Sequence, residues 1–363
     1  MLLMKSSFRC VFSFLLIPFG LAAADGQVTM TRSAQVDALF ADYDRPGVPG
    51  ASVIIIKDGK AVLKQAYGLA NVEEKIASTT ATNYRMASNT KQFTAMAIMM
   101  LAERKKLSYD ERLSDIFPGF PDYGKTITIR NLLNHTSGLL DYEDLMPADT
   151  KIPLTDNDVL IYLKQQDHTN FPPGSKFQYS NGAFVLLGLI VEKVSGMDFR
   201  EFLKQNIFQP LGMNHTVFYH RDDHSDRAHR AYGYSLKENA FVRTDQSLTS
   251  STRGDGTVYS SVDDLFKWDQ ALYTTKLVKA ETLKQAFTPG VAIDATTGYG
   301  FGWFIEKKRG LEMIGHTGNT MGSTSVIQRF PEKRFTVIIL TNRNDAELMG
   351  IVNKIEEIYL FAK

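Results

Sequence analysis

Three short motifs carry side chains whose types and spacing suit acyl transfer. The first is Ser88-Asn-Thr-Lys91, in which a hydroxyl and an amine stand three residues apart. At the start of a helix this spacing puts both side chains on one face. The amine can then take the serine proton, and the helix N-terminus favours developing negative charge. Because the spacing is common by chance, it equally fits a capping serine followed by a surface lysine.

The second motif is Tyr179-Ser180-Asn181. It follows the rigid turn Phe171-Pro-Pro-Gly174 and precedes an apolar segment. A tyrosine at such a helix entry can aim its hydroxyl into a cleft and relay a proton between nucleophile and leaving group. Asn181 can hold a substrate carbonyl or the Lys91 ammonium. The alternative interpretation is an N-cap asparagine beside a core tyrosine.

The third motif is His316-Thr317-Gly318, followed by Asn319, and it comes just before a predicted pair of strands. A glycine in an edge strand lets a ligand approach the backbone closely. The N–H groups of such a strand can bind an oxyanion. The alternative is an ordinary histidine at a strand end, with its ring satisfied by the backbone.

Composition excludes several other classes of protein. The chain has 363 residues, with 41 Lys+Arg against 40 Asp+Glu and 44% hydrophobic residues. This is an ordinary globular composition, which excludes wholesale disorder, collagen and coiled coil. A net charge close to zero gives no electrostatic basis for a nucleic-acid partner. No internal repeat stands out, which argues against solenoids and propellers.

The N-terminal residues 1–24 predict a secretory signal peptide. Lys5 and Arg9 form a positive region, residues 11–21 are almost wholly apolar, and Ala22-Ala23-Ala24 offers small residues for cleavage. An uncleaved anchor is the alternative, although the apolar run is short for a membrane span.

Cleavage would leave residues 25–363 as one domain with no cysteine, because the single cysteine is Cys10. A cysteine nucleophile and a thiolate metal site are thereby excluded. We expect an exported protein, periplasmic or secreted.

The hydrophobic pattern predicts an α+β fold. Helices are expected at 33–43, 89–104, 155–165, 181–195, 198–207 and at the C-terminus, and strands at 51–56, 61–63, 322–330 and 335–340. The simplest packing is one antiparallel sheet built from both chain ends and flanked by helices, with a mostly helical lobe inserted at about 90–255. A cleft between two such lobes is a natural place for the three motifs to meet.

Taken together and in this order, the motifs resemble those of the serine β-lactamase and penicillin-binding-protein superfamily. The Tyr-x-Asn form of the middle motif points to the branch of class C β-lactamases, D-aminopeptidases and related esterases. Three more stretches are similar to segments of that family: Leu132–Leu139, Gly254–Ser261 and Gly298–Trp303. The resemblance covers about residues 33–361.

The resemblance implies a role for each motif residue. Ser88 would be the acylated nucleophile, Lys91 its proton acceptor and Tyr179 the group that shuttles protons. The backbone N–H groups of Ser88 and Asn319 would form the oxyanion hole. The family reaction is attack on an ester or amide carbonyl, then hydrolysis of the acyl-enzyme, with no metal or organic cofactor. The substrate would be a small-molecule or peptide-like acyl compound, bound by Asn181, His316, Thr317, Gly318 and Asn319.

His316 departs from the family pattern, in which lysine mostly stands at this position. Lysine supplies a fixed positive charge for a substrate carboxylate, whereas an ordinary histidine supplies one that changes between about pH 5 and 8. This favours an esterase or an aminopeptidase-like amidase. A β-lactamase or D,D-peptidase acting on peptidoglycan-type substrates, or a non-catalytic binding protein on the same fold, are the alternatives.

Two further segments bear on function. The loops at about 140–155 and 215–255 are expected to set specificity, and His135 is expected to orient its own loop. The second of these loops is rich in metal-ligand types, but it lacks the helical periodicity that would place them on one face. We therefore expect a solvated loop and no metal site from the cluster His215, His220, Asp222, Asp223, His224, Asp226 and His229.

Overall fold

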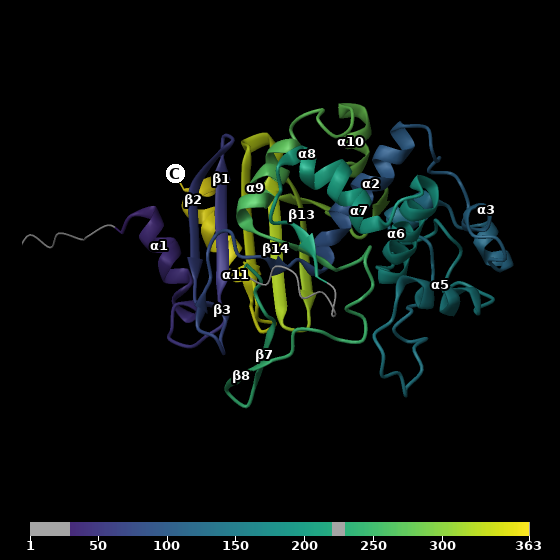
Figure 1. Cartoon of the computed structure of the whole chain (residues 1–363). Coiled ribbons are helices and arrows are strands. Elements are labelled where there is room, and N and C mark those ends of the chain that lie inside the picture. The colour runs from purple at the N-terminus through teal and green to yellow at the C-terminus, as the bar shows by residue number, and fades with distance from the viewer. Residues whose placement is uncertain (1–29, 220–228, 363) are drawn as a thin grey trace, which may run out of the picture.

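An eight-stranded antiparallel sheet forms the centre of the protein (Figure 1). The computed structural model describes residues 30–219 and 229–362. The strand order is β10-β11-β12-β13-β14-β15-β1-β2. The strands are β1 (Ala51–Lys57), β2 (Lys60–Tyr67), β10 (Val291–Ala292), β11 (Thr297–Tyr299), β12 (Phe304–Lys308), β13 (Leu311–Thr320), β14 (Ser323–Phe330) and β15 (Phe335–Thr341).

The two ends of the chain meet in the middle of this sheet. Strand β1 pairs with β15, with Ala51 opposite Thr341 and Lys57 opposite Phe335. The predicted sheet assembled from both chain ends is therefore confirmed. The predicted hairpins are present as β1–β2 and β14–β15.

Smaller strand pairs lie around the main sheet. Strand β9 (Val258–Ser260) lies between β5 (Tyr84–Arg85) and β6 (Val217–Phe218). Two hairpins complete the strands: β3 (Leu69–Asn71) with β4 (Ile76–Ala77), and β7 (Tyr234–Lys237) with β8 (Ala240–Arg243).

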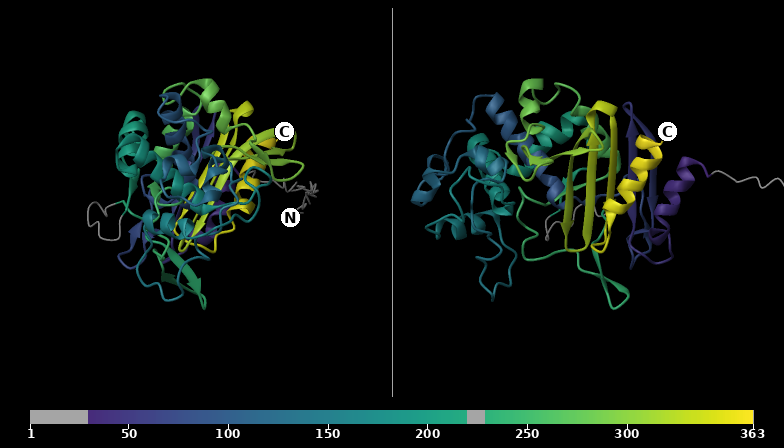
Figure 2. Two further views of the ribbon diagram at one scale, coloured as in Figure 1. Left: turned by 90° about the vertical axis from the view of Figure 1, so that its right-hand side faces the viewer. Right: turned by 180° about the vertical axis from the view of Figure 1, so that it is seen from behind.

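Both faces of the sheet are covered by helices, so its strands are apolar on both sides. Alternate residues of a strand point to opposite faces. Ile54 of β1 accordingly joins a core with helices α2 and α6, and Ile55 joins a second core with α1 and α11. Figure 2 shows α11 lying across the strands on the face opposite α2. The helices are α1 (Arg32–Leu39), α2 (Lys91–Glu103), α3 (Leu113–Ile116), α4 (Ile129–Leu133), α5 (Asp156–Lys164), α6 (Asn181–Ser195), α7 (Phe199–Leu203), α8 (Gln209–Leu211), α9 (Val262–Ala271), α10 (Ala280–Ala286) and α11 (Leu348–Glu356).

Helices α2 to α8 fall within the segment expected to form the inserted helical lobe. The centre of this lobe is α6, which packs against α2, α4, α5 and α7. Residues 182–191 of α6 are all buried, as its apolar sequence predicted. Helix α7 is capped by Asp198, the first residue of the helix expected at 198–207, because its carboxylate accepts from the N–H groups of Arg200 and Glu201.

One predicted helix differs in its starting residue. The helix expected at 89–104 begins at Lys91, after a 3₁₀ turn, η2 (Ala87–Thr90). Residues 91–101 are buried on every side because the sheet and the helical lobe enclose α2. Trp303, the last residue of the stretch Gly298–Trp303, directly precedes β12 and is buried.

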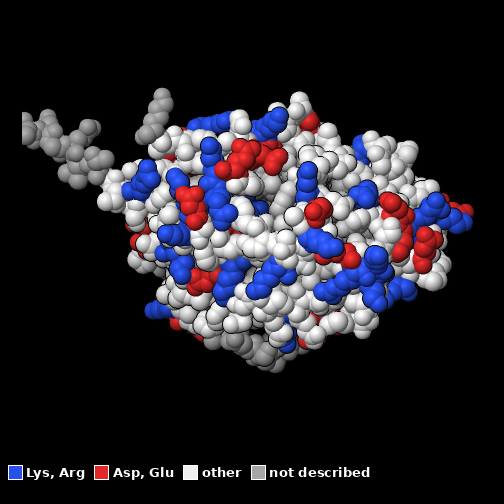
Figure 3. Space-filling model, turned by 90° about the horizontal axis from the view of Figure 1, so that it is seen from above, with Lys and Arg blue, Asp and Glu red and all other residues white. Residues whose placement is uncertain are grey.

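The predicted signal peptide, residues 1–24, lies outside the described residues. In the described ranges, no helix has the length and apolar character needed to cross a membrane. The face seen in Figure 3 carries basic and acidic side chains interspersed, in keeping with their near-equal numbers in the sequence.

Candidate active site

Ser88 lies in the 3₁₀ turn η2, which is fixed from two sides. The Met86 N–H donates to the Val258 carbonyl of β9 at 2.9 Å, and its carbonyl accepts from the Ser325 hydroxyl of β14 at 2.8 Å. Ala87 has φ +47°, a left-handed conformation that is uncommon for a residue with a Cβ. The turn presents Ser88 as partly exposed while its neighbours are buried.

Strand β13 passes directly against this turn, and Gly318 makes that approach possible. A Cβ at position 318 would lie 2.2 Å from the Met86 carbonyl oxygen and 2.6 Å from the Ser325 hydroxyl. Only glycine fits such a gap. The third motif is therefore brought to the first by direct backbone contact.

The Lys91 side chain is completely buried at the first turn of α2. Its Nζ lies 3.0 Å from Ser88 Oγ, 2.9 Å from Asn181 Oδ1 and 2.9 Å from the Asp255 carbonyl oxygen. The last two atoms can only accept hydrogen bonds, whereas a hydroxyl can also donate. In its neutral form the Lys91 amine would have two N–H groups for the two acceptors and one lone pair for the Ser88 proton. The geometry therefore lets Lys91 receive that proton without moving.

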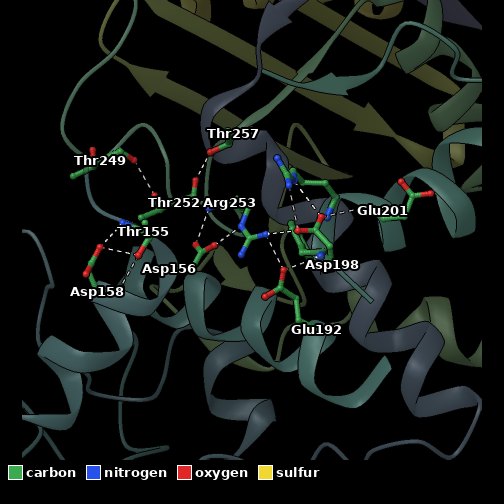
Figure 4. Close-up of polar contacts among 12 residues, drawn as sticks. Thr155, Asp156, Asp158, Glu192, Asp198, Glu201, Thr249, Thr252, Arg253 and Thr257 are labelled. Atoms are coloured by element: carbon green, nitrogen blue, oxygen red, sulfur yellow. Dashed lines mark hydrogen bonds and ion pairs between the residues drawn. The ribbon is translucent and has the colours of Figure 1, made fainter. Parts of the chain in front are cut away.

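A loop closes over Lys91 from the side of α6 and holds the Asp255 carbonyl in place. Gly254 packs so closely on α6 that a Cβ there would lie 2.1 Å from the Phe184 carbonyl oxygen. Figure 4 shows the neighbouring Arg253 between three acidic side chains. Its guanidinium contacts the carboxylates of Asp156 at 2.5 Å, Glu192 at 2.8 Å and Asp198 at 2.9 Å. These ion pairs tie the loop to α5, α6 and the start of α7.

Tyr179 stands beside Lys91, with Nζ 4.9 Å from the centre of its ring. Its hydroxyl is buried and has no hydrogen-bond partner within the described part of the chain. Buried hydroxyls are usually paired. This hydroxyl is therefore available to a group that enters the site.

His135 positions the Tyr179 segment, as its predicted structural role requires. Its Nδ1 accepts from the Ser180 N–H at 3.1 Å, and its carbonyl accepts from the Gln178 N–H at 2.9 Å. Its ring lies 4.3 Å from that of Tyr179. Burial, together with the positive charge of Lys91, holds the pKa of His135 well below its usual value, so the ring is neutral.

Asn181 is the first residue of α6. The helix is capped by Ser180, whose hydroxyl accepts from the Ala183 N–H at 3.1 Å, so the interpretation of Asn181 as N-cap is wrong. The Asn181 amide oxygen faces Lys91, and its amide also hydrogen-bonds the carboxylate of Glu143. Asn181 thus links the buried amine to an acidic side chain in the loop at 140–155.

His316 differs from its predicted behaviour. Its Nδ1 lies 2.6 Å from the Thr317 carbonyl oxygen, to which it donates, and its Nε2 lies 3.1 Å from the Tyr299 hydroxyl. Burial and the nearby charge of Lys91 lower the pKa of His316 to about 3. The expectation of a charge that changes between about pH 5 and 8 is therefore wrong, because the buried ring stays neutral there.

The remaining residues of the third motif lie along a free strand edge. The pairing of β12 with β13 ends at Gly315, so residues 316–320 have a strand partner only in β14 among the residues described. The Thr317 and Asn319 side chains are exposed, and Gly318 is buried. The structure thus brings all the predicted site residues of the three motifs around one place.

Sequence reasoning missed three residues of this site: Glu143, Asp255 and Tyr299. Asp255 and Tyr299 lie inside the stretches Gly254–Ser261 and Gly298–Trp303, whose likeness to family segments was their only signal. Glu143 had no signal beyond its place in a loop expected to set specificity.

No metal site is evident where the structure can be read. Residues 220–228 of the histidine-rich segment lie outside the described residues. His215 and His229 lie close, with ring centres 5.2 Å apart. Across the described ranges, no three His, Cys, Asp or Glu side chains gather as a metal site would require.

A cavity of about 560 Å³ opens next to Met321, just beyond the end of β13. It is lined by the two loops expected to set specificity and by Met321, which directly follows β13. Its wall includes Met146 and Lys151 from the first loop and residues 246–251 from the second. Its position suits it to hold part of a substrate.

The fold and site define a hydrolase of the serine β-lactamase and penicillin-binding-protein type. The chain belongs to the Beta-lactamase family, whose model matches residues 36–355. Penicillin-binding protein 4* of Bacillus subtilis (strain 168) is 34% identical over 333 residues, which cover 86% of this chain and 72% of that protein.

Solved structures of similar proteins have the same fold. The octameric penicillin-binding protein homologue from Pyrococcus abyssi superposes with a TM-score of 0.78 at 30% identity, covering 90% of this chain and 76% of that one. A D-amino acid amidase from Ochrobactrum anthropi SV3 has the same fold, with a TM-score of 0.76 at 24% identity and coverage of 90% and 97%.

Proposed function

We propose that the protein cleaves an ester or amide bond through an acyl-enzyme on Ser88, with Lys91 and Tyr179 as the proton-transfer groups. One observation carries this proposal: a buried amine lies 3.0 Å from the Ser88 hydroxyl, and its other two contacts are acceptors only. A surface lysine after a capping serine would have neither the burial nor the contacts. The family and its hydrolase members support the same reaction type.

The proposed reaction follows from this geometry. Lys91 takes the Ser88 proton while Oγ attacks the substrate carbonyl carbon, and the oxyanion accepts from the N–H groups of Ser88 and Asn319. Tyr179 passes a proton to the leaving group, whose bond to the carbonyl carbon then breaks. Water hydrolyses the acyl-enzyme by the reverse proton path.

The charges around the site favour substrates with an amino group over substrates with a carboxylate. His316 is neutral and supplies no cation. Glu143 is exposed and its carboxylate reaches Asn181, which contacts Lys91. Amides and esters of amino acids with a free amine fit this arrangement better than β-lactams or peptidoglycan stems, and a D-amino acid amidase shares the fold.

Labelling by a fluorophosphonate tests the nucleophile. Wild type should be labelled and Ser88→Ala should not, since phosphonylation needs the Ser88 oxygen. Equal labelling of the two folded proteins would show that another residue reacts. Failure of every acylating probe on folded wild type would instead favour a non-catalytic binding protein.

A matched pair of substrates tests the amine preference. Wild type should cleave an amino acid p-nitroanilide with a lower KM than its N-acetyl counterpart, and Glu143→Gln should reduce the ratio of the two KM values by about two- to fivefold, as for loss of an exposed ion pair. Asp149→Asn, an exposed change in the same loop, should keep it. Preferential turnover of nitrocefin or D-Ala-D-Ala peptides would favour the β-lactamase or D,D-peptidase alternative.

We also propose that the protein is exported, periplasmic or secreted, on the strength of residues 1–24. Mass spectrometry of the protein from its native cells should find a mature N-terminus close to residue 25. A full-length N-terminus on the protein would contradict the proposal.

A further inference from the structure

A chain of hydrogen bonds between four uncharged side chains runs through the core from α9 to β14. The Trp268 indole N–H donates to the Gln92 amide oxygen at 3.0 Å, and the Gln92 amide nitrogen donates to the Asn89 amide oxygen at 2.8 Å. The Asn89 amide nitrogen donates to the Ser325 hydroxyl at 2.8 Å. Each of these residues is at most 1% exposed. Polar side chains are costly to bury unpaired, and among the described residues none of these four leaves a buried nitrogen or oxygen without a partner.

This buried chain holds the turn η2 on both sides of the nucleophile. The Ser325 hydroxyl donates to the Met86 carbonyl at 2.8 Å, and Met86 directly precedes the turn. Asn89, a member of the chain, lies within the turn and directly follows Ser88. Between them Ala87 has φ +47°, a conformation that an isolated turn would rarely adopt. The chain therefore holds the two residues between which Ser88 and this unusual conformation lie.

The direction of every bond in the chain is set by the indole of Trp268. An indole N–H can donate but cannot accept, so the Gln92 amide must turn its oxygen towards the indole. The Gln92 NH₂ group then faces Asn89, and the Asn89 NH₂ group in turn faces Ser325. A hydroxyl that receives a hydrogen bond on its oxygen keeps its own hydrogen for Met86. A side chain of α9 thereby decides which way a hydroxyl next to the turn points.

We propose that this buried chain positions the Ser88 hydroxyl for attack, so that Trp268 and Gln92 are positioning residues that act on the reaction without touching the substrate. This inference rests on the proposed function. Side chains joined in one hydrogen-bond network act as a unit. Removing one member frees the members beyond it to turn over, and the turn η2 then loses the Ser325 hydroxyl as a fixed anchor. The rate of attack falls, whereas binding of the reagent that Ser88 attacks does not change.

The test is phosphonylation of Ser88 by a fluorophosphonate, separated into the maximal rate kinact and the half-saturating concentration KI. Trp268→Phe keeps an aromatic side chain but removes the donor, and Gln92→Met keeps the length of the side chain but removes the amide. Each should lower kinact about 3- to 10-fold and leave KI unchanged, a smaller loss than the about 100-fold that a displacement of about 1 Å costs. Ser325→Ala removes the anchor itself and should lower kinact about 10- to 30-fold.

A double variant separates positioning from a purely structural role. Distant residues with separate roles give losses that multiply, whereas members of one network do not. Trp268→Phe combined with Ser325→Ala should therefore react no more slowly than Ser325→Ala alone, since the anchor is already gone. Losses that multiply would overturn the inference, and so would an unchanged kinact in either Trp268→Phe or Gln92→Met.

Ser52→Ala is the control for loss of a buried hydroxyl in the same sheet. Ser52 is completely buried, and its hydroxyl pairs with the Thr79 carbonyl at 2.9 Å and the Tyr84 hydroxyl at 3.2 Å, outside the turn. This variant should keep kinact, and an equal loss in it would overturn the inference, because general destabilisation would then explain the effect. Circular dichroism shows which variants fold; where Ser325→Ala does not, the single variants of α9 and α2 decide. Failure of the proposed function is distinct, since wild-type Ser88 would then not be labelled at all.

Discussion

Replacing Gly318 by alanine tests whether the contact between β13 and the Ser88 turn is needed for activity. The new Cβ would lie 2.2 Å from the Met86 carbonyl oxygen, 2.6 Å from Ser325 Oγ and 3.1 Å from the Ala87 Cβ. An ordinary van der Waals contact is about 3.4 Å or more, so strand and turn must separate by about 1 Å. Two of the three contacts belong to the segment that precedes Ser88, so the shift reaches the nucleophile itself.

The magnitude follows from this displacement. A misplacement of about 1 Å in a reacting geometry costs about 100-fold in rate. Overpacking of a well-packed site costs about 1–3 kcal/mol of unfolding free energy. We therefore expect Gly318→Ala to fold, to be destabilised by that amount and to lose about 100-fold in kcat/KM.

The assay is ester hydrolysis together with urea unfolding, and Gly350→Ala is the matched control. Gly350 lies on the exposed side of α11, and nothing stands within 4 Å of a Cβ there. Alanine is a better helix former than glycine, so this control should be fully active and about 0.5–1 kcal/mol more stable. Wild-type activity and stability in Gly318→Ala would refute the idea that close approach of β13 positions the nucleophile.

Two more predictions concern the polar groups of the site. Tyr179→Phe should lower kcat about 100-fold or more, as for loss of a general acid–base group. The unfolding free energy should stay nearly unchanged, because the lost hydroxyl has no hydrogen-bond partner in the described structure. An unchanged kcat would show that Tyr179 takes no part in the reaction. His316 stays neutral in the folded protein, whereas the same histidine in the unfolded chain binds a proton below about pH 6.5. The free energy of unfolding should therefore fall as the pH drops from about 6 towards 3, by up to about 1.4 kcal/mol per pH unit. Urea unfolding at several pH values should show a shallower fall in His316→Asn, and identical slopes would mean that His316 is not buried as a neutral ring.

The main features of the site could be predicted because they lie in short contiguous motifs. Ser88 and Lys91 are three residues apart, and Tyr179 and Asn181 are two apart, so helix geometry alone aligns each pair. The order of the three motifs along the chain then indicated the family. The sheet was predictable for a similar reason, since the hairpins β1–β2 and β14–β15 are local patterns of apolar residues.

Properties that depend on tertiary burial could not be predicted. The neutral state of His316 results from its enclosure beside Lys91 and Tyr299, and the sequence shows only a histidine at a strand end. The buried carboxyl of Asp255 results from the contact of Gly254 with α6, whose nearest atom belongs to Phe184, 70 positions away along the chain. The all-round burial of α2 likewise needs both the sheet and the helical lobe.

The pairing of the two chain ends has a consequence for biosynthesis. The Gly50 N–H donates to the Asn342 side chain, 292 positions further along. The turn that carries Ser88 is likewise fastened to Ser325, a residue made long after the helical lobe. A nascent chain on the ribosome therefore holds its nucleophile, amine and phenol without the strands that align them. Contacts this distant in sequence form slowly because a long loop must close first. We therefore expect the site to assemble only when synthesis is almost complete, and a chain that stops short of β15 to lack activity.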